Sequence, residues 1–499
     1  MDYIKGMDIS SYQEMLDKGY EYYDEDGKKV DILKYAVEKG FNYARVRIWN
    51  NPLNVPESGG YCSLEETIKL ARKIKEIGIP YLLDFHYSDW WADPGNQKKP
   101  KDWEYLSGID LINAVYSYTK EVLNVLSDNG VSPSMVQVGN EIRCGMLWPD
   151  GNSDDYRCLV KLINAGIKGV KDSNNGKNIK IMLHLDQGGR YHYFEEWFDG
   201  VIRNGLDDFD VIGLSYYPFW HGTYQDLDDT LTKLEKRYKK DLIIAEVAYG
   251  YRLGDDSLFG KGQERLGGYK ASEDGQFKAM QIISGLIHGV DNSRGKGFFY
   301  WEPFMRSNDS SGWGYCMGLV DENGNPLKTL KEMKTAFPID VDDARNMYSK
   351  VKYTDDSTKH IEGKNVIRID GFKNNLEGWN YSNPDNVDYE ITEENNVFKF
   401  GSTGNVKFEL SQNQVIENTG NYKLAVDYRG DNTTGVSVKL FIKFPDYRRE
   451  INIYPSDKMW TKGILDVHME CGTEVEMGVE VDSPKITGEI RNVALYLEK

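Results

Sequence analysis

Short apolar runs alternate with longer amphipathic segments over roughly the first two thirds of the chain. The runs have the length of strands buried on both faces of a parallel sheet. Segments such as Leu64–Ile77 place apolar residues every three to four positions, as surface helices do. The predicted strands are Ile4–Ile9, Tyr43–Trp49, Tyr81–His86, Met135–Gly139, Ile179–Leu185, Val211–Tyr216, Leu242–Glu246 and Gly297–Trp301. The clearest predicted helices are Leu64–Ile77, Leu111–Asp128, Asp155–Asp172, Leu227–Lys239 and Gly275–Val290.

This succession of strand-then-helix units predicts an α/β fold, a closed (β/α)8 TIM barrel over residues 1–337. An open doubly wound sheet would carry a glycine-rich phosphate turn after its first strand, and this sequence has none there. The pattern changes near Pro338. Residues 338–365 are polar and charged and predict a helical or extended linker. Residues 366–499 alternate apolar and polar positions between turn signals, as in an all-β jelly-roll or β-sandwich domain.

Composition narrows the classes of function. The 499 residues carry a net charge of −18, which repels a phosphate backbone and argues against nucleic acid as a partner. No apolar run approaches the roughly 20 residues that span a bilayer, so no membrane partner is expected. The chain contains 34 Tyr and 11 Trp. Aromatic rings pack against the C–H faces of sugars, and this excess therefore favours a carbohydrate ligand.

Two predicted strands end on a glutamate, Glu141 in Gln137-Val-Gly-Asn-Glu141 and Glu246 in Leu242-Ile-Ile-Ala-Glu246. The carboxyl ends of barrel strands form the face where such enzymes place catalytic groups. Two carboxylates there predict a glycosidase, one acting as general acid/base and the other as nucleophile. Either glutamate alone is more often structural.

Other strand-end residues complete this hypothesis. The amide of Asn140 is placed to bind a sugar 2-hydroxyl, and Trp301 to form the floor of the subsite at the cleavage point. Arg45 and Arg47 are expected to pair with a buried glutamate and lower its pKa, as a nucleophile requires. Tyr216 is expected to hydrogen-bond Glu246.

Several long motifs appear in order along residues 1–337 and closely resemble those of the family 53 glycoside hydrolases, which are arabinogalactan endo-β-1,4-galactanases. They are Gly6-Met-Asp-Ile-Ser-Ser11, Arg45-Val-Arg-Ile-Trp-Asn-Asn-Pro52, Asp84-Phe-His-Tyr-Ser-Asp-Trp-Trp-Ala-Asp-Pro94, Gln137-Val-Gly-Asn-Glu-Ile142, Gly145-Met-Leu-Trp-Pro149 and Gly213-Leu-Ser-Tyr-Tyr-Pro-Phe-Trp-His-Gly222.

The resemblance implies a barrel of the retaining clan whose catalytic residues follow strands four and seven, Glu141 as acid/base and Glu246 as nucleophile. It also places several residues along the substrate cleft: His86, Trp91, Trp220, His221 and Trp301. Asp84 is expected to be a hydrogen-bond partner in the same cleft.

Metal chemistry is the rival interpretation of the histidines. His86, His184 and His221 fall near strand ends, but none belongs to a His-x-His pair of the kind that metallohydrolases use. No catalytic metal and no required cofactor are therefore expected. Histidines in the cleft are expected instead to hydrogen-bond sugar hydroxyls or the catalytic carboxylates. Some bacterial members of the family hold a structural calcium, for which Tyr249–Glu273 and Pro303–Val320 are the candidate segments.

The C-terminal domain resembles a carbohydrate-binding module, a domain type that accompanies this barrel. Its candidate sugar-binding residues are Trp379, Tyr447 and Trp460, with Arg429 and Arg448 beside them. As the alternative, both tryptophans would belong to the sandwich core and both arginines would be solvated loop residues. A non-binding spacer is the alternative for the whole domain.

Together these features predict a retaining endo-β-1,4-galactanase that cleaves the galactan side chains of pectin. A clan relative acting on mannan, xylan or glucan and a non-catalytic galactan-binding protein are the alternatives. The protein is expected to be a monomer. It is expected to be secreted or held at the cell surface, with a signal peptide absent from this sequence, and an intracellular location is the alternative.

Overall fold

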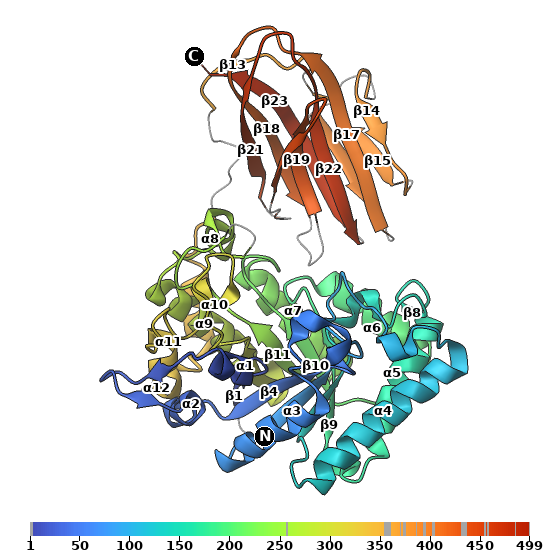
Figure 1. The fold of residues 1–499 in the computed structure, drawn as a ribbon, viewed down its shortest axis with the longest axis vertical. Coiled ribbons are helices and arrows are strands. Elements are labelled where there is room, and N and C mark those ends of the chain that lie inside the picture. Colours follow the sequence, from blue (N-terminus) through green and yellow to red (C-terminus); the bar gives the residue numbers. More distant parts are fainter. Residues whose placement is uncertain are drawn as a thin grey trace. The chain divides into compact units, whose positions relative to one another are not determined.

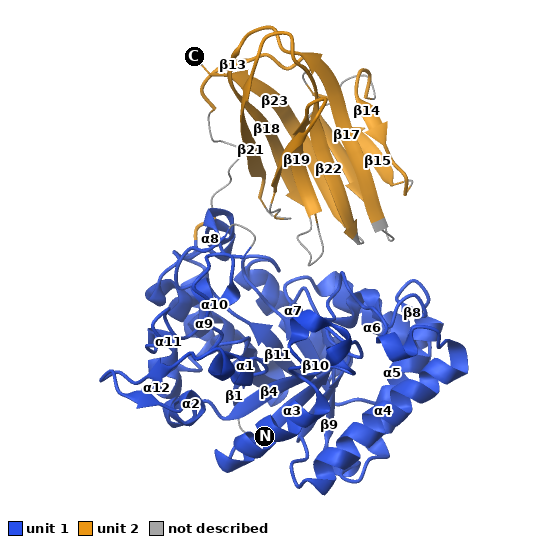
Figure 2. Cartoon of the chain, viewed as in Figure 1, with its two compact units in different colours: residues 1–351 blue, residues 352–499 orange. Residues whose placement is uncertain are grey.

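The computed structural model describes residues 3–255, 258–353, 361–369, 371–372, 376–385, 387–392, 396–401, 405–430, 437–453, 456, 459–484 and 486–498. The chain divides into two compact units, Met1–Val351 and Lys352–Lys499 (Figure 2). Each unit has its own hydrophobic core.

The first unit is the predicted TIM barrel (Figure 1). Its parallel strands close in the order β1-β12-β11-β10-β9-β6-β5-β4. They are β1 (Ile4–Asp8), β4 (Tyr43–Ile48), β5 (Tyr81–Phe85), β6 (Met135–Val138), β9 (Lys180–Leu185), β10 (Val211–Ser215), β11 (Asp241–Val247) and β12 (Gly295–Tyr300). All eight predicted strands are confirmed to within a few residues at each end.

Large side chains fill the inside of the barrel, so the interior is a packed core and not a channel. Buried members of this cluster come from the barrel strands and include Tyr43, Met182 and Phe299. Gly6 leaves room for one of them, because a Cβ atom at this position would lie 2.2 Å from Cδ1 of Phe299.

Amphipathic helices cover the outside of the barrel. The long ones are α2 (Ile32–Lys39), α3 (Leu64–Glu76), α4 (Gly108–Asp128), α5 (Tyr156–Lys171), α6 (Tyr191–Arg203), α7 (Tyr224–Tyr238) and α9 (Glu273–His288). The shorter ones are α1 (Tyr12–Asp17), α8 (Lys261–Gly267), α10 (Trp313–Cys316), α11 (Lys328–Lys331) and α12 (Met333–Ala336). Two small hairpins pair β2 (Tyr22–Tyr23) with β3 (Lys29–Val30), and β7 (Gly145–Met146) with β8 (Gly151–Asn152).

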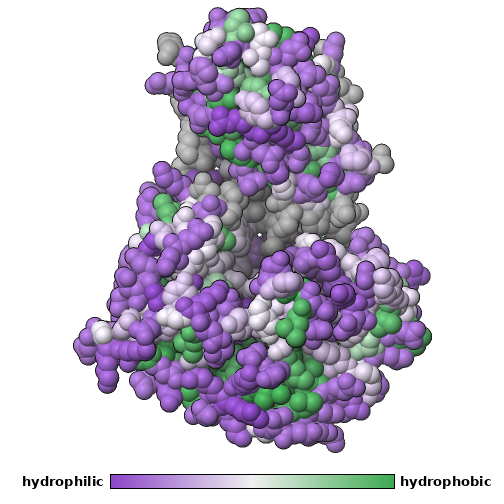
Figure 3. Space-filling view, in the orientation of Figure 1, coloured by the Kyte–Doolittle hydropathy of each residue, from purple (hydrophilic) through white to green (hydrophobic). Residues whose placement is uncertain are grey.

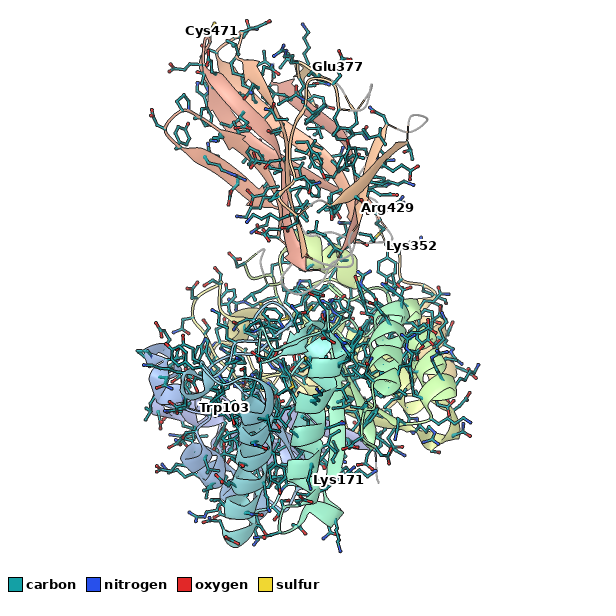
Figure 4. The ribbon with its side chains drawn as sticks, turned by 90° about the vertical axis from the view of Figure 1, so that its right-hand side faces the viewer. Trp103, Lys171, Lys352, Glu377, Arg429 and Cys471 are labelled. Carbon is teal, nitrogen blue, oxygen red and sulfur yellow. The ribbon has the colours of Figure 1, made fainter. Side chains whose placement is uncertain are left out.

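Local capping fixes where these helices begin. Ser63 accepts a hydrogen bond from the backbone of Glu66 at the start of α3, and Thr223 forms a capping box with Asp226 at the start of α7. The helices run back against the strand direction. Lys171, which ends α5 and is labelled in Figure 4, therefore marks the end of the barrel opposite the strand carboxyl ends.

The boundary of the first unit lies beyond the predicted end at residue 337. Residues Val341–Tyr348, placed in the predicted linker 338–365, form helix α13, which packs against α9. Arg345 on α13 makes a two-pronged ion pair with Asp228 of α7, at 2.8 and 3.0 Å. The predicted helical or extended linker is thus helical in its first part, and this short polar helix docks on the first unit through one buried alanine, Ala344, and the ion pair of Arg345.

The second unit is a β-sandwich, as predicted. One sheet has the order β15-β16-β23-β18-β21, with β13 paired to β23, and the other has the order β14-β17-β22-β19-β20. Its antiparallel strands are β13 (Lys364–Asn365), β14 (Asn380–Ser382), β15 (Asp388–Thr392), β16 (Val397–Gly401), β17 (Asn405–Val415), β18 (Gly420–Gly430), β19 (Ser437–Lys443), β20 (Arg448–Asn452), β21 (Thr461–Met469), β22 (Glu474–Pro484) and β23 (Thr487–Leu497).

Inward side chains of both sheets, such as Val426 and Leu440, share one core.

The surface agrees with the acidic, polar composition. The face drawn in Figure 3 is mainly hydrophilic on both units. No described helix is both long and apolar enough to cross a membrane. All five cysteines are free thiols, and two of them, Cys158 and Cys471, are exposed.

Candidate active site

Polar side chains from most barrel strands converge at the strand carboxyl ends. Glu246 is the last residue but one of β11, and Glu141 lies three residues after the end of β6. The remaining buried members of this group are Asp8, Arg45, Arg47, Asp84, His86, Gln137, Asn140, His184, Ser215 and Glu302. The two glutamates retain 6% and 7% of their accessible surface, so each is enclosed but still open to a ligand.

The backbone at Glu141 is strained. Its φ and ψ are both 49°, in the left-handed region that non-glycine residues rarely occupy. Gly139, two residues earlier, has a φ of 84°. Such a conformation costs on the order of 1–3 kcal/mol and persists only where the surroundings impose it. The next residue, Ile142, is held in place because its carbonyl accepts a 3.0 Å hydrogen bond from the indole N–H of Trp197. The chain therefore holds the Glu141 side chain in one direction.

Arg45 is the centre of the charge network. Its Nη1 lies 2.8 Å from Asp8 and 2.9 Å from Glu246, and its Nη2 lies 2.8 Å from Asp84 and 2.9 Å from Oδ1 of Asn140. Only 1% of Arg45 is exposed. One guanidinium thus faces three carboxyl groups in a buried site, so negative charge is only partly balanced there.

This balance sets the pKa of Glu246. Burial raises the pKa of Glu246 to about 7, and the Arg45 guanidinium opposes that rise. The prediction of an arginine–nucleophile pair is confirmed for Arg45, but the expected net lowering of the pKa is wrong because desolvation outweighs the ion pair. Arg47 instead pairs with Glu302, which also accepts a hydrogen bond from Ser11 at 2.8 Å.

A tyrosine hydroxyl also binds Glu246, and it belongs to Tyr217. This hydroxyl donates to Oε2 of Glu246 at 3.0 Å, while the hydroxyl of Tyr216 donates to the carbonyl of Gly222 at 3.0 Å. The prediction of Tyr216 was therefore wrong by one residue. Burial and the neighbouring Glu246 raise the pKa of Tyr217 well above its usual range, so its hydroxyl stays a donor.

The pKa of Glu141 is raised as well, and besides burial the charge of Glu246 is one of the causes. Burial and, next, the charge of Glu246 raise the pKa of Glu141 well above its ordinary value. Ser215 opposes this rise by donating to Oε1 of Glu141 at 2.6 Å. The arrangement suits a group that carries a proton while Glu246 is ionised.

The histidines bind protein groups. His86 contacts Asp84 through Nε2 at 3.1 Å and accepts from the backbone N–H of Ala92 through Nδ1 at 3.0 Å. Burial lowers the pKa of His184 well below its usual range, and that of His221 to about 4, so both rings are neutral. Nδ1 of His221 lies 3.0 Å from the carbonyl of Ser215.

No group of three or more potential metal ligands occurs among the described residues, and this holds for the described parts of Tyr249–Glu273 and Pro303–Val320. The structure gives no support to a calcium ion there.

Tryptophans form a wall beside these polar groups. Trp91 stacks on the Arg47 guanidinium at 4.0 Å and lies 6.0 Å from Trp301, measured between ring centroids. Trp301 in turn packs edge-on against Trp313 at 4.4 Å. The ring of Trp220 lies 5.4 Å from that of Tyr217, the tyrosine that binds Glu246. The predicted cleft residues Trp91, Trp220 and Trp301 thus surround the carboxylate network.

Several residues of this site were not predicted from the sequence, namely Asp8, Ser215, Tyr217 and Trp313. The rule that found Glu141 and Glu246 also applies to Asp8 and Ser215, because each is the last residue of a barrel strand. His184 is expected to hydrogen-bond sugar hydroxyls or a catalytic carboxylate, and in the structure its Nε2 lies 2.9 Å from Ser215, the residue that binds Glu141, while its Nδ1 lies 3.1 Å from Asn140.

The module candidates divide into buried and exposed residues. Trp379 belongs to the sandwich core and donates through its indole N–H to the carbonyl of Gly371 at 2.9 Å. Trp460 is buried beneath the guanidinium groups of Arg491 and Arg429, at 3.8 and 4.7 Å. Neither ring is an open sugar platform, so both predictions are corrected, and Arg429, labelled in Figure 4, pairs with Glu489.

The remaining two candidates lie near the other sheet. Tyr447 is 55% exposed and stacks on Phe444 at 4.4 Å, so it keeps its candidate role. Arg448 is not a solvated loop residue. It lies on β20, 4.0 Å from the ring centroid of Phe441, and pairs with Glu480 at 2.7 Å.

Comparison with known proteins agrees with this geometry. The chain is 35% identical over 311 residues to the endo-β-1,4-galactanase of Bacillus subtilis, which covers 60% of this chain and 70% of that protein. It is 33% identical over 313 residues to arabinogalactan endo-β-1,4-galactanase A of Aspergillus niger, covering 62% and 87%.

The solved structure of the Ignisphaera aggregans GH53 catalytic domain matches with 38% identity and a TM-score of 0.63, covering 67% of this chain and 96% of that one. The family model described as Glycosyl hydrolase family 53 matches residues 4–336, which is the whole barrel. With its paired strand-end glutamates on this barrel, the chain belongs to glycosyl hydrolase family 53 and is a glycoside hydrolase.

Proposed function

We propose that this protein is a retaining endo-β-1,4-galactanase that hydrolyses the galactan side chains of pectin. The observation that carries the proposal is the unequal pair of glutamates: Glu246 is held by Arg45 and Tyr217, whereas Glu141 faces the charge of Glu246. The substrate follows from the galactanases of Bacillus subtilis and Aspergillus niger, which the barrel resembles.

The chemistry proceeds by double displacement. A carboxylate oxygen of Glu246 attacks the anomeric carbon while the bond from this carbon to the leaving oxygen breaks, and Glu141 gives its proton to that oxygen. The product of this step is a glycosyl ester on Glu246. Glu141, now ionised, takes a proton from water, the resulting hydroxide attacks the anomeric carbon, and Glu246 leaves as a carboxylate.

The environment of Glu141 fits both of its roles. While Glu246 is charged, its field keeps the proton on Glu141. Once Glu246 is esterified this charge is gone, so the pKa of Glu141 falls and it can accept a proton from water. Asn140 is proposed to bind the sugar 2-hydroxyl beside it, and Trp301 to support the sugar ring.

A panel of purified polysaccharides tests the substrate. We expect release of reducing ends from linear β-1,4-galactan, and an α/β ratio in early products, read by ¹H NMR, that shows the β-anomer first. Hydrolysis of mannan, xylan or glucan with none of galactan would reject the substrate. Loss of hydrolysis with retained galactan binding in Glu246→Ala would exclude a purely binding protein.

We also propose that the C-terminal sandwich binds galactan. Its support is Tyr447 on Phe444, next to a surface cavity of 540 Å³ that Phe444 lines together with polar residues, among them Arg368, Asn413, Lys443, Glu474 and Glu476. The full chain carrying Glu246→Ala leaves galactan intact, and its retardation in galactan-containing gels measures binding. We expect Tyr447→Ala in that background to reduce retardation, and unchanged mobility in the gel would favour the spacer alternative.

The protein is further proposed to act as a secreted or cell-surface monomer, since a polysaccharide cannot cross a membrane to reach an intracellular enzyme. Sedimentation velocity and the distribution of activity between culture medium and cells test these two points.

A further inference from the structure

A surface cavity of 730 Å³ lies beside the active site, between the loops that follow β4, β5 and β6. This volume falls within the roughly 300–1,000 Å³ of small-molecule sites. Its lining residues are Asn54, Val55, Ser88, Asp89, Trp90, Trp91, Asn96, Lys98, Lys99, Lys101, Glu104, Trp148 and Pro149. We call it the tryptophan groove, because three of these residues are tryptophans.

All three tryptophans are half-buried, so part of each ring is available to a ligand. Trp90 is fixed from behind by Trp49, with 4.6 Å between ring centroids. The indole N–H of Trp148 donates to the carbonyl of Cys144 at 2.8 Å, which holds that ring in place. Rigid, partly exposed aromatic rings are the groups that pack against the C–H faces of sugars.

The tryptophan groove adjoins the active site at Trp91. This residue lines the groove and also contacts Arg47 and Trp301 of the aromatic wall. The β5 loop that carries it is bound to the acid/base loop, since the side-chain amide of Gln97 donates to the carbonyl of Asn140 at 2.8 Å. Trp91 is thus a side chain that the groove shares with the aromatic wall of the active site.

Two of the charged groups that line the groove, those of Lys99 and Asp89, are occupied by protein partners. Lys99 pairs with Asp150 at 2.6 Å. The carboxylate of Asp89 accepts from the backbone N–H groups of Asn51 and Lys101, both at 2.9 Å, and from the side chain of Asn54 at 2.8 Å. The side chains of Lys98, Lys101 and Glu104 are exposed in the groove and carry both signs of charge. Together with the ring faces they suit a ligand that presents hydroxyl groups and C–H faces, as a sugar does.

We propose that the tryptophan groove binds galactosyl units of the substrate chain that lie away from the cleavage point. Trp90 and Trp148 then determine how long a chain must be for efficient cleavage and which product lengths accumulate. This inference rests on the proposed galactanase function and adds to it a second binding region.

Kinetics on long and short substrates test the groove. We expect Trp90→Ala and Trp148→Ala to lower kcat/KM on galactohexaose by about tenfold, the equivalent of roughly 1.4 kcal/mol of lost ring contact. Activity on a short aryl β-1,4-galactobioside should stay within twofold, and the sites of cleavage in reducing-end-labelled hexaose should shift.

Two control variants separate binding from damage to the fold. Trp90→Phe keeps a flat ring and should restore most of the hexaose activity. Tyr105→Ala removes a 92% exposed aromatic residue of the same loop that does not line the groove, and should change neither substrate.

Equal losses on both substrates in Trp90→Ala, or unchanged hexaose kinetics and products, would overturn the groove alone. A wild-type chain without activity on galactan would instead reject the proposed function.

Discussion

The hydroxyl of Ser215 donates a 2.6 Å hydrogen bond to Oε1 of Glu141. The hydroxyl oxygen of Ser215 also lies 2.9 Å from Nε2 of His184, whose ring is kept neutral by burial. Because the hydroxyl proton of Ser215 is used in the hydrogen bond to Glu141, Nε2 of His184 must be protonated and donate to the Ser215 oxygen. His184 therefore positions Ser215, and Ser215 stabilises the ionised form of Glu141 that the second chemical step needs.

Ser215→Ala removes this stabilisation. The pKa of Glu141 should rise further, since burial and the charge of Glu246 act unopposed. The basic limb of the pH profile of kcat/KM should move to higher pH, and the maximum should fall by about tenfold, consistent with a hydrogen bond to a charged group worth roughly 1.5–3 kcal/mol. An unshifted basic limb would contradict the role given to Ser215.

The pH profile of the wild-type enzyme should be bell-shaped. The pKa of Glu246 is about 7, so activity should rise with pH as this nucleophile loses its proton. It should fall again at higher pH, where Glu141 loses the proton that the leaving group requires. The profile of kcat/KM reports these groups in the free enzyme. A profile that only falls above pH 5 would show that Glu246 is not the group titrating on the acidic side.

The effect of the Glu246 charge on the pKa of Glu141 can be checked directly. Glu246→Gln removes the charge that, after burial, most raises the pKa of Glu141. We expect Glu141 to titrate at lower pH in this variant, measured by ¹³C NMR of the glutamate carboxyl carbons. Glu14→Gln, on a surface helix, is the control and should leave the Glu141 titration unchanged.

The barrel and its two glutamates were predictable from the sequence because each strand is buried on both faces. The sequence of such a strand is an uninterrupted apolar run, so a carboxylate at its end is easily identified. Tyr216 and Tyr217 could not be separated in this way. Neighbouring residues of a strand point to opposite sides, and the pairing of β10 with β11 shifts register between Leu214 and Ser215, just before the two tyrosines.

The module shows a second limit. Trp379 and Trp460 lie in a β-rich sequence whose pattern does not distinguish a core ring from a sugar platform. Only the fold reveals that Trp379 bonds to Gly371 inside the sandwich and that arginines cover Trp460. The docking of the helix Val341–Tyr348 on the first unit could not be predicted for a related reason, since the few apolar residues of this helix do not indicate a buried face.

Arg45 is expected to matter for both stability and activity. Arg45→Ala would leave Asp8, Asp84 and Glu246 without their shared counter-charge in a buried site, and breaking such a network costs about 3–5 kcal/mol. Urea denaturation should show this loss. Since the guanidinium lowers the pKa of Glu246, the acidic limb of any residual activity should move to higher pH. Arg45→Lys keeps the charge but loses the two-pronged guanidinium group, and should change both the stability to urea and the acidic limb less than Arg45→Ala does.

The two adjacent tyrosines provide a matched pair of variants. Tyr217→Phe removes the 3.0 Å hydrogen bond to Glu246, which lowers the pKa of that carboxyl, so the acidic limb should move to higher pH. We expect kcat/KM to fall by about tenfold, or roughly 1.4 kcal/mol. Tyr216→Phe removes a bond to the Gly222 carbonyl instead, and should reduce stability slightly without moving either limb. If Tyr216→Phe shifted the acidic limb and Tyr217→Phe did not, Tyr217 would lose its assignment as the partner of Glu246.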